Sequence, residues 1–132
     1  VRTLQGLVFI LDDNIELAKQ QFQSVLEKTD NPMSKTISQI YLLQIALIEG
    51  DNKKAEEYAS IRGVKSFLSI KTADMQVIQA WYQFKVKKDV VQTHKAMKIA
   101  KQKMDSSRML RDEKRYYENW LAELEKELTE GV

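Results

Sequence analysis

The residues that could carry out acid–base or nucleophilic chemistry are few, and they lie far apart in the sequence. His94 is the only histidine, and the chain has no cysteine. A general base works with a nucleophile or an orienting partner within hydrogen-bond reach, and no second catalytic element accompanies His94. We therefore interpret His94 as an exposed histidine on the surface of a helix.

Acidic residues occur in adjacent pairs, such as Asp12-Asp13 and Glu56-Glu57. Neighbouring residues on a helix point about 100° apart, so such a pair does not converge on one site. We interpret these carboxylates as helix caps and solvated groups rather than as catalytic or metal-binding groups. The four glycines stand alone, so no glycine-rich loop can hold a phosphate. We expect no enzyme activity, no metal site and no cofactor.

The clearest electrostatic feature is a basic segment, residues 85–115, which holds 11 basic and 4 acidic side chains. The basic strip within it consists of Lys95, Lys98, Lys101, Arg108 and Arg111. The three lysines are spaced to share one helix face, and the two arginines follow across a turn. Such a strip can bind phosphates with salt-sensitive affinity, so an anion- or nucleic-acid-binding module is one hypothesis.

Other features of the sequence favour a more ordinary role for the basic strip. Residues 116–132 hold 5 acidic side chains and 1 basic one, so Glu118, Glu123 or Glu125 can pair with the lysines. The isoelectric point of 8.7 falls below the usual value for a nucleic-acid-binding domain. We favour a solvated or internally paired strip, then an anionic protein or membrane surface, and place nucleic acid last.

Composition predicts an all-α fold. Hydrophobic residues make up 43% of the 132 residues and charged ones 30%, which is typical of a globular protein. Four glycines and one proline are too few for a β-rich fold, which needs a turn about every 8–12 residues. The length fits one domain, so we predict a single helical domain over residues 1–132.

The sequence also bears on location. No run approaches the roughly 18 consecutive apolar residues of a membrane span. The lack of cysteine fits the cytoplasm, or the outer face of a bacterium that avoids disulfides. The start, VRTLQGLVFIL, lacks the layout of a signal peptide. We expect a cytoplasmic, soluble bacterial domain, and we leave open that it is a fragment whose longer chain carries an upstream membrane anchor.

Apolar periodicity predicts about seven helices joined by short turns. A first short helix over residues 4–11 precedes Asp12-Asp13-Asn14, and a second ends where Asn31-Pro32 forces a turn. The third begins at Asn31 or Ser34 and ends at Gly50. It has almost no polar face, so we expect it to be the central element of the core.

Further along the chain, Asp51 or Asn52 begins a fourth helix, which we expect to end at Gly63. The segment 64–71 is too short to assign from periodicity. Thr72 begins a fifth helix, and Lys88-Asp89 separates it from the sixth. The predicted buried stripe of the sixth helix is Val90, Thr93, Met97, Ala100 and Met104.

The last predicted helix is the longest. Asp105-Ser106-Ser107 caps it, and it extends from Ser107 to Thr129. Its apolar seam is Leu110, Tyr117, Trp120, Leu121, Leu124 and Leu128. A seam of this length must pack on the rest of the chain or on a partner, so self-association through this helix is a further hypothesis.

A small residue recurs in successive second helices, at Ala18, Ala55 and Thr93, 37 or 38 residues apart. The residues that match around these positions are Gly6, Phe9, Phe22 and Val25 in the first unit, Ala46, Gly50 and Ala59 in the second, and Phe84, Met97 and Ala100 in the third. Leu43 and Trp81 stand where small residues are usual. This pattern resembles the tetratricopeptide repeat family, in which small residues let helix hairpins pack closely.

The resemblance implies stacked antiparallel helix hairpins in a right-handed superhelix. The repeats would span about 2–32, 34–64 and 72–104, and residues 107–129 would form a capping helix. It also implies a non-catalytic scaffold that binds a protein or peptide in a concave groove. The implied groove positions are Thr3, Leu7, Ile40, Gln44, Ile78, Tyr82 and Lys85. Most are apolar, which suggests an amphipathic or extended peptide, or a groove filled by the chain's own last helix.

Overall fold

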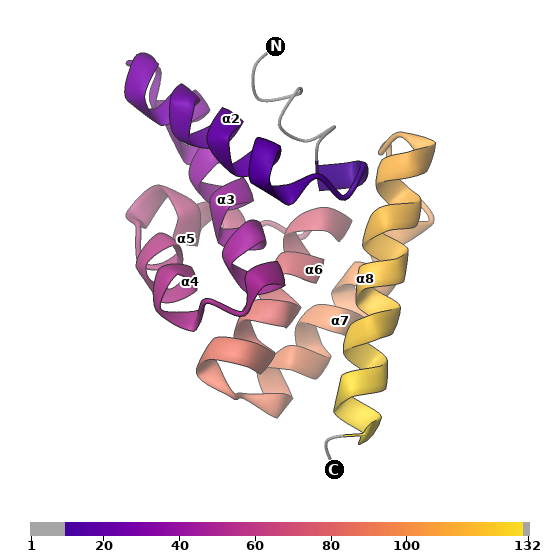
Figure 1. The fold of residues 1–132 in the computed structure, drawn as a ribbon. Helices are drawn as coiled ribbons and strands as arrows, with labels where there is room; N and C mark the ends of the chain where they lie inside the picture. The colour runs from indigo at the N-terminus through magenta and orange to yellow at the C-terminus, as the bar shows by residue number, and fades with distance from the viewer. Residues whose placement is uncertain (1–9, 131–132) are drawn as a thin grey trace. The chain divides into compact units, whose positions relative to one another are not determined.

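The structure, a computed structural model, describes residues 10–130, and every regular element within that range is helical (Figure 1). The elements are α2 (Ile15–Lys28), α3 (Pro32–Glu49), α4 (Asn52–Ala59), α5 (Arg62–Leu68), α6 (Ala73–Tyr82), the π-helical segment η1 (Gln83–Lys87), α7 (Val90–Met104) and α8 (Arg111–Glu130). The predicted all-α class is thus confirmed for the described residues, with seven α-helices. Most of the predicted first helix, residues 4–11, lies outside them, as do Thr3, Gly6, Leu7 and Phe9.

The chain divides into two compact units, Val1–Phe67 and Leu68–Val132. The first contains α2, α3, α4 and most of α5, and the second contains α6, η1, α7 and α8. The boundary falls between the second and third predicted repeats. The stacking of all repeats into one superhelical domain stays a prediction.

In the first unit, α3 packs against both α2 and α4. It begins where the side chain of Asn31 accepts hydrogen bonds from two backbone amides, with Pro32 in the first turn, and it ends at Gly50, whose φ of 76° favours glycine. The ring of Phe22 stacks on that of Tyr41, with centroids 5.0 Å apart. Most of the second half of α3 is buried, as its apolar sequence predicts.

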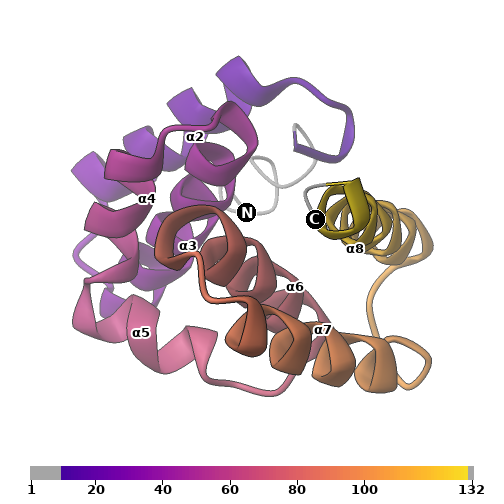
Figure 2. The ribbon, with the colours of Figure 1, turned by 90° about the horizontal axis from the view of Figure 1, so that it is seen from below.

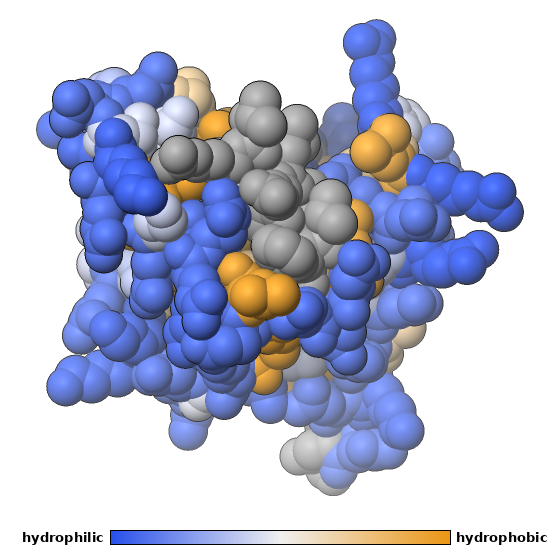
Figure 3. Space-filling view, turned by 45° about the horizontal axis from the view of Figure 1, so that its top comes forward, coloured by the Kyte–Doolittle hydropathy of each residue, from blue (hydrophilic) through white to orange (hydrophobic). Residues whose placement is uncertain are grey.

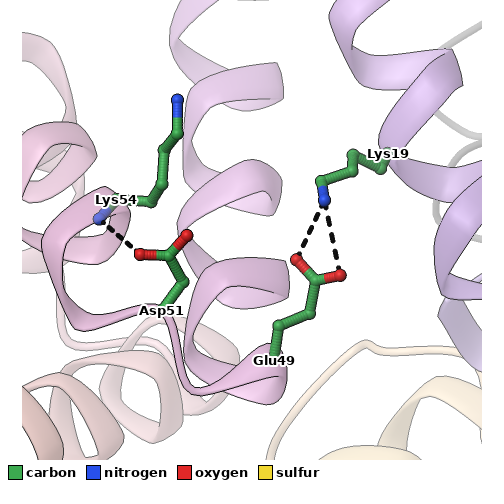
Figure 4. A network of polar contacts seen from close by, with 4 residues as sticks. All are labelled: Lys19, Glu49, Asp51 and Lys54. Carbon is green, nitrogen blue, oxygen red and sulfur yellow. Dashed lines mark hydrogen bonds and ion pairs between the residues drawn. The ribbon is translucent and has the colours of Figure 1, made fainter.

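Polar contacts fix the corner between α3 and α4 (Figure 4). The ammonium of Lys19 on α2 lies 3.1 Å from a carboxylate oxygen of Glu49 at the end of α3, and this hydrogen bond raises the pKa of Lys19. The carboxylate of Asp51 accepts a hydrogen bond of 3.1 Å from the amide of Lys54. Asp51 is therefore the cap of α4, one of the two residues predicted for that role.

The prediction that Gly63 ends the fourth helix is wrong. Helix α4 ends at Ala59, and Gly63 lies inside the next helix, α5. A Cβ atom on Gly63 would lie 2.9 Å from the side-chain oxygen of Thr36 on α3. Glycine is therefore needed here because α5 closely approaches α3, and not because the backbone turns.

In the second unit, α6 and α7 lie side by side as a hairpin (Figure 2). Helix α6 ends in the π-helical turn η1, after which Lys88 adopts a left-handed conformation with φ of 54°. The carboxylate of Asp89 then caps α7 by accepting a hydrogen bond of 3.0 Å from the amide of Gln92. The predicted break at Lys88-Asp89 is therefore confirmed.

The last helix begins later than predicted. Helix α8 starts at Arg111, so Asp105-Ser106-Ser107 does not cap it, and the side chain of Leu110 is 76% exposed instead of joining the apolar seam. The hydroxyl of Ser107 accepts a hydrogen bond from the amide of Met109, which stabilises a turn in the connection. Such local side-chain hydrogen bonds compete with helix formation.

Two tryptophans attach α8 to α6. The rings of Trp81 and Trp120 stack with centroids 5.3 Å apart, and the indole N–H of Trp81 donates to the backbone carbonyl of Trp120 at 3.1 Å. Trp81, a large residue in the predicted third repeat, thus provides the surface on which the last helix packs.

The recurring small positions lie in the core. Ala18, Ala55 and Thr93 are all fully buried. The hydroxyl of Thr93 donates to the backbone carbonyl of Asp89 at 2.8 Å, which satisfies a polar group that would otherwise be costly to bury. Of the helices between residues 10 and 130, none combines the length and the apolar character that crossing a membrane requires.

Candidate functional site

The predicted groove positions do not form an open surface. Ile40, Gln44, Ile78 and Tyr82 are each 6% exposed or less, so a partner cannot reach their side chains in this conformation. The ammonium of Lys85 lies 2.6 Å from a carboxylate oxygen of Glu127 on α8. In the second unit the last helix packs on α6. This packing agrees with one of the two interpretations of the apolar groove, a groove filled by the chain's own last helix. Thr3 and Leu7 lie outside the described residues.

The residues of the basic strip have different environments in the structure. Lys101 is paired with Glu125 of α8, with the two charged atoms 2.5 Å apart, so internal pairing holds for this lysine. Lys95 and Lys98 are exposed on α7 and form no ion pair within residues 10–130. Arg108 lies in the connection before α8, and Arg111 is the first residue of that helix.

Four of the six residues of the predicted seam of α8 pack within the chain, and self-association through this helix stays a hypothesis. Tyr117, Trp120, Leu121 and Leu124 are all buried, so these side chains pack within the chain. On the face drawn in Figure 3, hydrophobic residues reach the surface only in limited patches between hydrophilic ones. No observation in the described residues favours self-association through this helix.

A groove of about 430 Å³ opens in the second unit between η1, α7 and the end of α8. We call it the α7–α8 groove. Its apolar lining consists of Phe84, Val90, Met97 and Leu128, and its polar lining of His94, Lys101, Glu125, Glu127 and Thr129. Its volume lies within the range of about 300–1,000 Å³ that is common for ligand pockets.

The sequence explains how α7 provides one wall of this groove. Val90, His94, Met97 and Lys101 follow one another at intervals of three or four residues, which places them on one face of the helix. His94 is exposed, as predicted from the sequence. Val90, however, was predicted to be buried, and its side chain is 53% exposed. The predicted stripe is therefore wrong at its first residue, because Val90 begins α7 beside the open groove.

The π-helical turn and the end of α8 provide the rest of the lining. Phe84 and Lys85 belong to η1, and a π-turn inserts one residue into the helical pattern. The side chains of Phe84 and Lys85 therefore point in other directions than they would if α6 continued as a regular α-helix. The ammonium of Lys85 lies 5.4 Å from the centre of the Phe84 ring. Leu128, on the last turns of α8, lies in the groove although the sequence placed it in the buried seam.

Two ion pairs border the groove, Lys85 with Glu127 and Lys101 with Glu125. All four side chains are at least a third exposed, so each pair contributes at most about 1 kcal/mol to stability. Their main consequence is that Glu125 and Glu127, the two acidic residues of α8 that line the groove, are neutralised. The exposed Lys95 and Lys98 therefore leave an excess of positive charge on α7 near the groove.

Within residues 10–130, no group of three His, Cys, Asp or Glu side chains is placed so that it could hold a metal ion.

Comparison of the chain with models of protein families, with curated proteins and with solved structures finds no match.

Sequence reasoning missed the groove because η1 and α7 form it together with the end of α8, which is distant from them in sequence. A local signal was nevertheless present at the start of α7. Val90 and Val91 are the first two residues of α7, and they follow the polar residues Lys87, Lys88 and Asp89. Apolar residues that begin a helix after such a polar stretch lie at the edge of the buried stripe, where exposure is common.

Proposed function

We propose that the protein is a non-catalytic interaction module, and that its second unit binds an acidic, partly apolar segment of a partner protein in the α7–α8 groove. The observation that carries this proposal is the open apolar lining. Val90 is 53% exposed and lies in the same groove as Phe84, Met97 and Leu128. A recess with apolar walls and a few polar groups at its edge is typical of a binding site.

Charge indicates the chemistry of the partner. The carboxylates of Glu125 and Glu127 are already paired, whereas Lys95 and Lys98 form no ion pair in the part of the chain that the structure describes. A segment with Asp or Glu beside an apolar anchor would place its charge against these lysines. Complementary charge of this kind mainly speeds association and selects the partner.

We also propose that the helix hairpins stack in the manner of tetratricopeptide repeats. The packing of α3 on α4 and of α6 on α7, together with the complete burial of Ala18, Ala55 and Thr93, supports this architecture. Repeat scaffolds of this class bind peptides, so the architecture and the proposed function agree. The proposed site differs from the family's concave positions, which are buried here.

The experiment compares two adjacent valines. Random twelve-residue peptides displayed on phage are selected on the immobilised protein, and the enriched peptides are measured by fluorescence anisotropy. We expect them to combine apolar residues with Asp or Glu. Val90→Ser should weaken binding about tenfold or more, because burying a valine contributes about 1.5 kcal/mol and each 1.4 kcal/mol is a factor of ten.

Val91→Ser is the matched control, and neither variant changes the charge near the lysines. Val91 is 74% exposed, carries the same side chain and does not line the groove, so this variant should bind within about twofold of the unchanged protein. Both valines are exposed, and both variants should therefore keep the helical circular dichroism spectrum. Peptides that bind both variants equally well, or a selection that enriches nothing, would show that the groove is not the binding site.

A further inference from the structure

A second cavity lies in the same unit, on a different side of α7. It has a volume of about 420 Å³ and is formed where the start of α6, the end of α7 and the connection to α8 meet. We call it the Lys103 pocket. Three cations line it, and each comes from a different segment: Lys71 before α6, Lys103 in the last turn of α7 and Arg108 in the connection.

The opposite charges in the Lys103 pocket do not pair with one another. Asp74 and Glu113 line the same cavity, yet neither carboxylate forms an ion pair with Lys71, Lys103 or Arg108. The three cations are exposed, and an exposed ion pair gains little energy, so these groups can stay separate. The pocket therefore presents separate cationic and carboxylate groups to whatever enters it.

The two carboxylates have different environments. The carboxylate of Asp74 accepts hydrogen bonds from the hydroxyl of Thr72 at 2.8 Å and from the amide of Met75 at 2.9 Å, so it is used within the start of α6. Burial, followed by the negative charge of Asp74, raises the pKa of Glu113. Burial and the neighbouring Asp74 thus disfavour the charged form of Glu113 relative to an ordinary glutamate.

A hydroxyl adds a hydrogen-bond donor to the cations. The oxygen of Ser107 accepts a hydrogen bond from the amide of Met109, which leaves the hydroxyl proton available to a ligand. Arginine, lysine and serine together form the set that proteins commonly use for phosphate, and an arginine can bind two phosphate oxygens at once. Carboxylates, in turn, accept hydrogen bonds from hydroxyl groups.

We propose that the Lys103 pocket binds a small phosphorylated polyol, such as a sugar phosphate. The phosphate contacts Lys71, Lys103 and Arg108, and the hydroxyl groups donate to the carboxyl groups of Asp74 and Glu113. This assignment gives a role to both kinds of charge in the pocket. The volume also leaves room for a sugar beside the phosphate. The site is independent of the α7–α8 groove.

Calorimetric titration with three probes tests the assignment: glucose 6-phosphate, inorganic phosphate and glucose. We expect glucose 6-phosphate to bind most tightly, inorganic phosphate more weakly and glucose not measurably. Lys103→Ala and Arg108→Ala should each weaken binding of glucose 6-phosphate about tenfold, as the loss of a hydrogen bond to a charged group costs about 1.5–3 kcal/mol. Both side chains are exposed, so the variants should fold.

Two further variants distinguish a pocket from a diffuse basic surface. Glu113→Gln should strengthen binding of inorganic phosphate several-fold, because it removes a negative charge from the cavity. Lys95→Ala removes an exposed lysine of α7 that does not line this pocket, and it should leave both affinities unchanged. The proposal is overturned if glucose 6-phosphate binds no better than inorganic phosphate, if Glu113→Gln has no effect, or if Lys95→Ala weakens binding as much as Lys103→Ala does.

Discussion

Because α5 closely approaches α3, we predict that one mutation either lowers or raises the stability of the protein, depending on the residue at a second position. Gly63→Ala adds a methyl group that would lie 2.9 Å from the oxygen and 3.4 Å from the methyl carbon of the Thr36 side chain. Thr36 is β-branched and part of α3, so its side chain has few other rotamers to adopt. The added methyl group must therefore displace the helices or strain the threonine.

The expected magnitudes have opposite signs. Overpacking a close contact costs about 1–3 kcal/mol, whereas replacing glycine by alanine within a helix gains about 0.5–1 kcal/mol. Gly63→Ala alone should therefore lower the free energy of unfolding by about 1 kcal/mol. In a Thr36→Ala background only the Cβ atom remains, at an ordinary contact distance of 3.7 Å. There the same mutation should raise the free energy of unfolding by about 0.5–1 kcal/mol.

The assay is urea unfolding of the four proteins of this double-mutant cycle, followed by circular dichroism in the far ultraviolet. The coupling between the two positions should be about 1–3 kcal/mol. If Gly63→Ala is equally destabilising with threonine and with alanine at position 36, the contact is not the reason for glycine.

Two further predictions concern buried polar groups. Ser38→Ala should stabilise the protein by about 1 kcal/mol in the same urea assay, since the Ser38 hydroxyl is fully buried and has no hydrogen-bond partner among residues 10–130; a loss of stability would indicate a hydrogen bond to another part of the chain. Burial and Asp74 raise the pKa of Glu113 above its ordinary value of 4.5, so the folded state holds this proton more tightly than the unfolded state does. The resulting stabilisation is complete below the pKa of Glu113 in the unfolded state, and it is lost as the pH rises through the pKa of Glu113 in the folded state. Between about pH 4 and pH 7, the Glu113→Gln variant should therefore lose less stability than the unchanged protein. Equal losses in parallel unfolding curves would contradict this.

Local sequence signals gave the helix starts that depend on a residue's own side chain. Asn31, Asp51 and Asp89 each cap the helix that follows them, through hydrogen bonds to amides two or three residues later. The end of α3 at Gly50 was equally predictable, because a positive φ favours glycine whatever surrounds it. These features need only neighbouring residues, so the sequence is sufficient to find them.

The errors occurred where a distant element decides the outcome. Gly63 faces Thr36, which lies 27 positions earlier in the chain, and no local pattern reveals that contact. The exposure of Val90 depends on where the end of α8 lies, since Leu128 contributes to the same groove. Four of the positions expected to line a binding groove, Ile40, Gln44, Ile78 and Tyr82, are buried for the same reason, as packing covers them.

The sequence alone determined that this chain is helical, where most of its helices begin, and which small residues recur in the core. Helix propensity, capping and periodicity act over about one turn of the chain, so they can be read without coordinates. Only the tertiary structure decided that Lys101 is neutralised by Glu125, that Val90 lies in an open groove, and that Lys71, Lys103 and Arg108 line one cavity. Those arrangements join residues separated by up to 45 positions, Phe84 and Thr129 in the groove, and the packing of whole helices sets their distances.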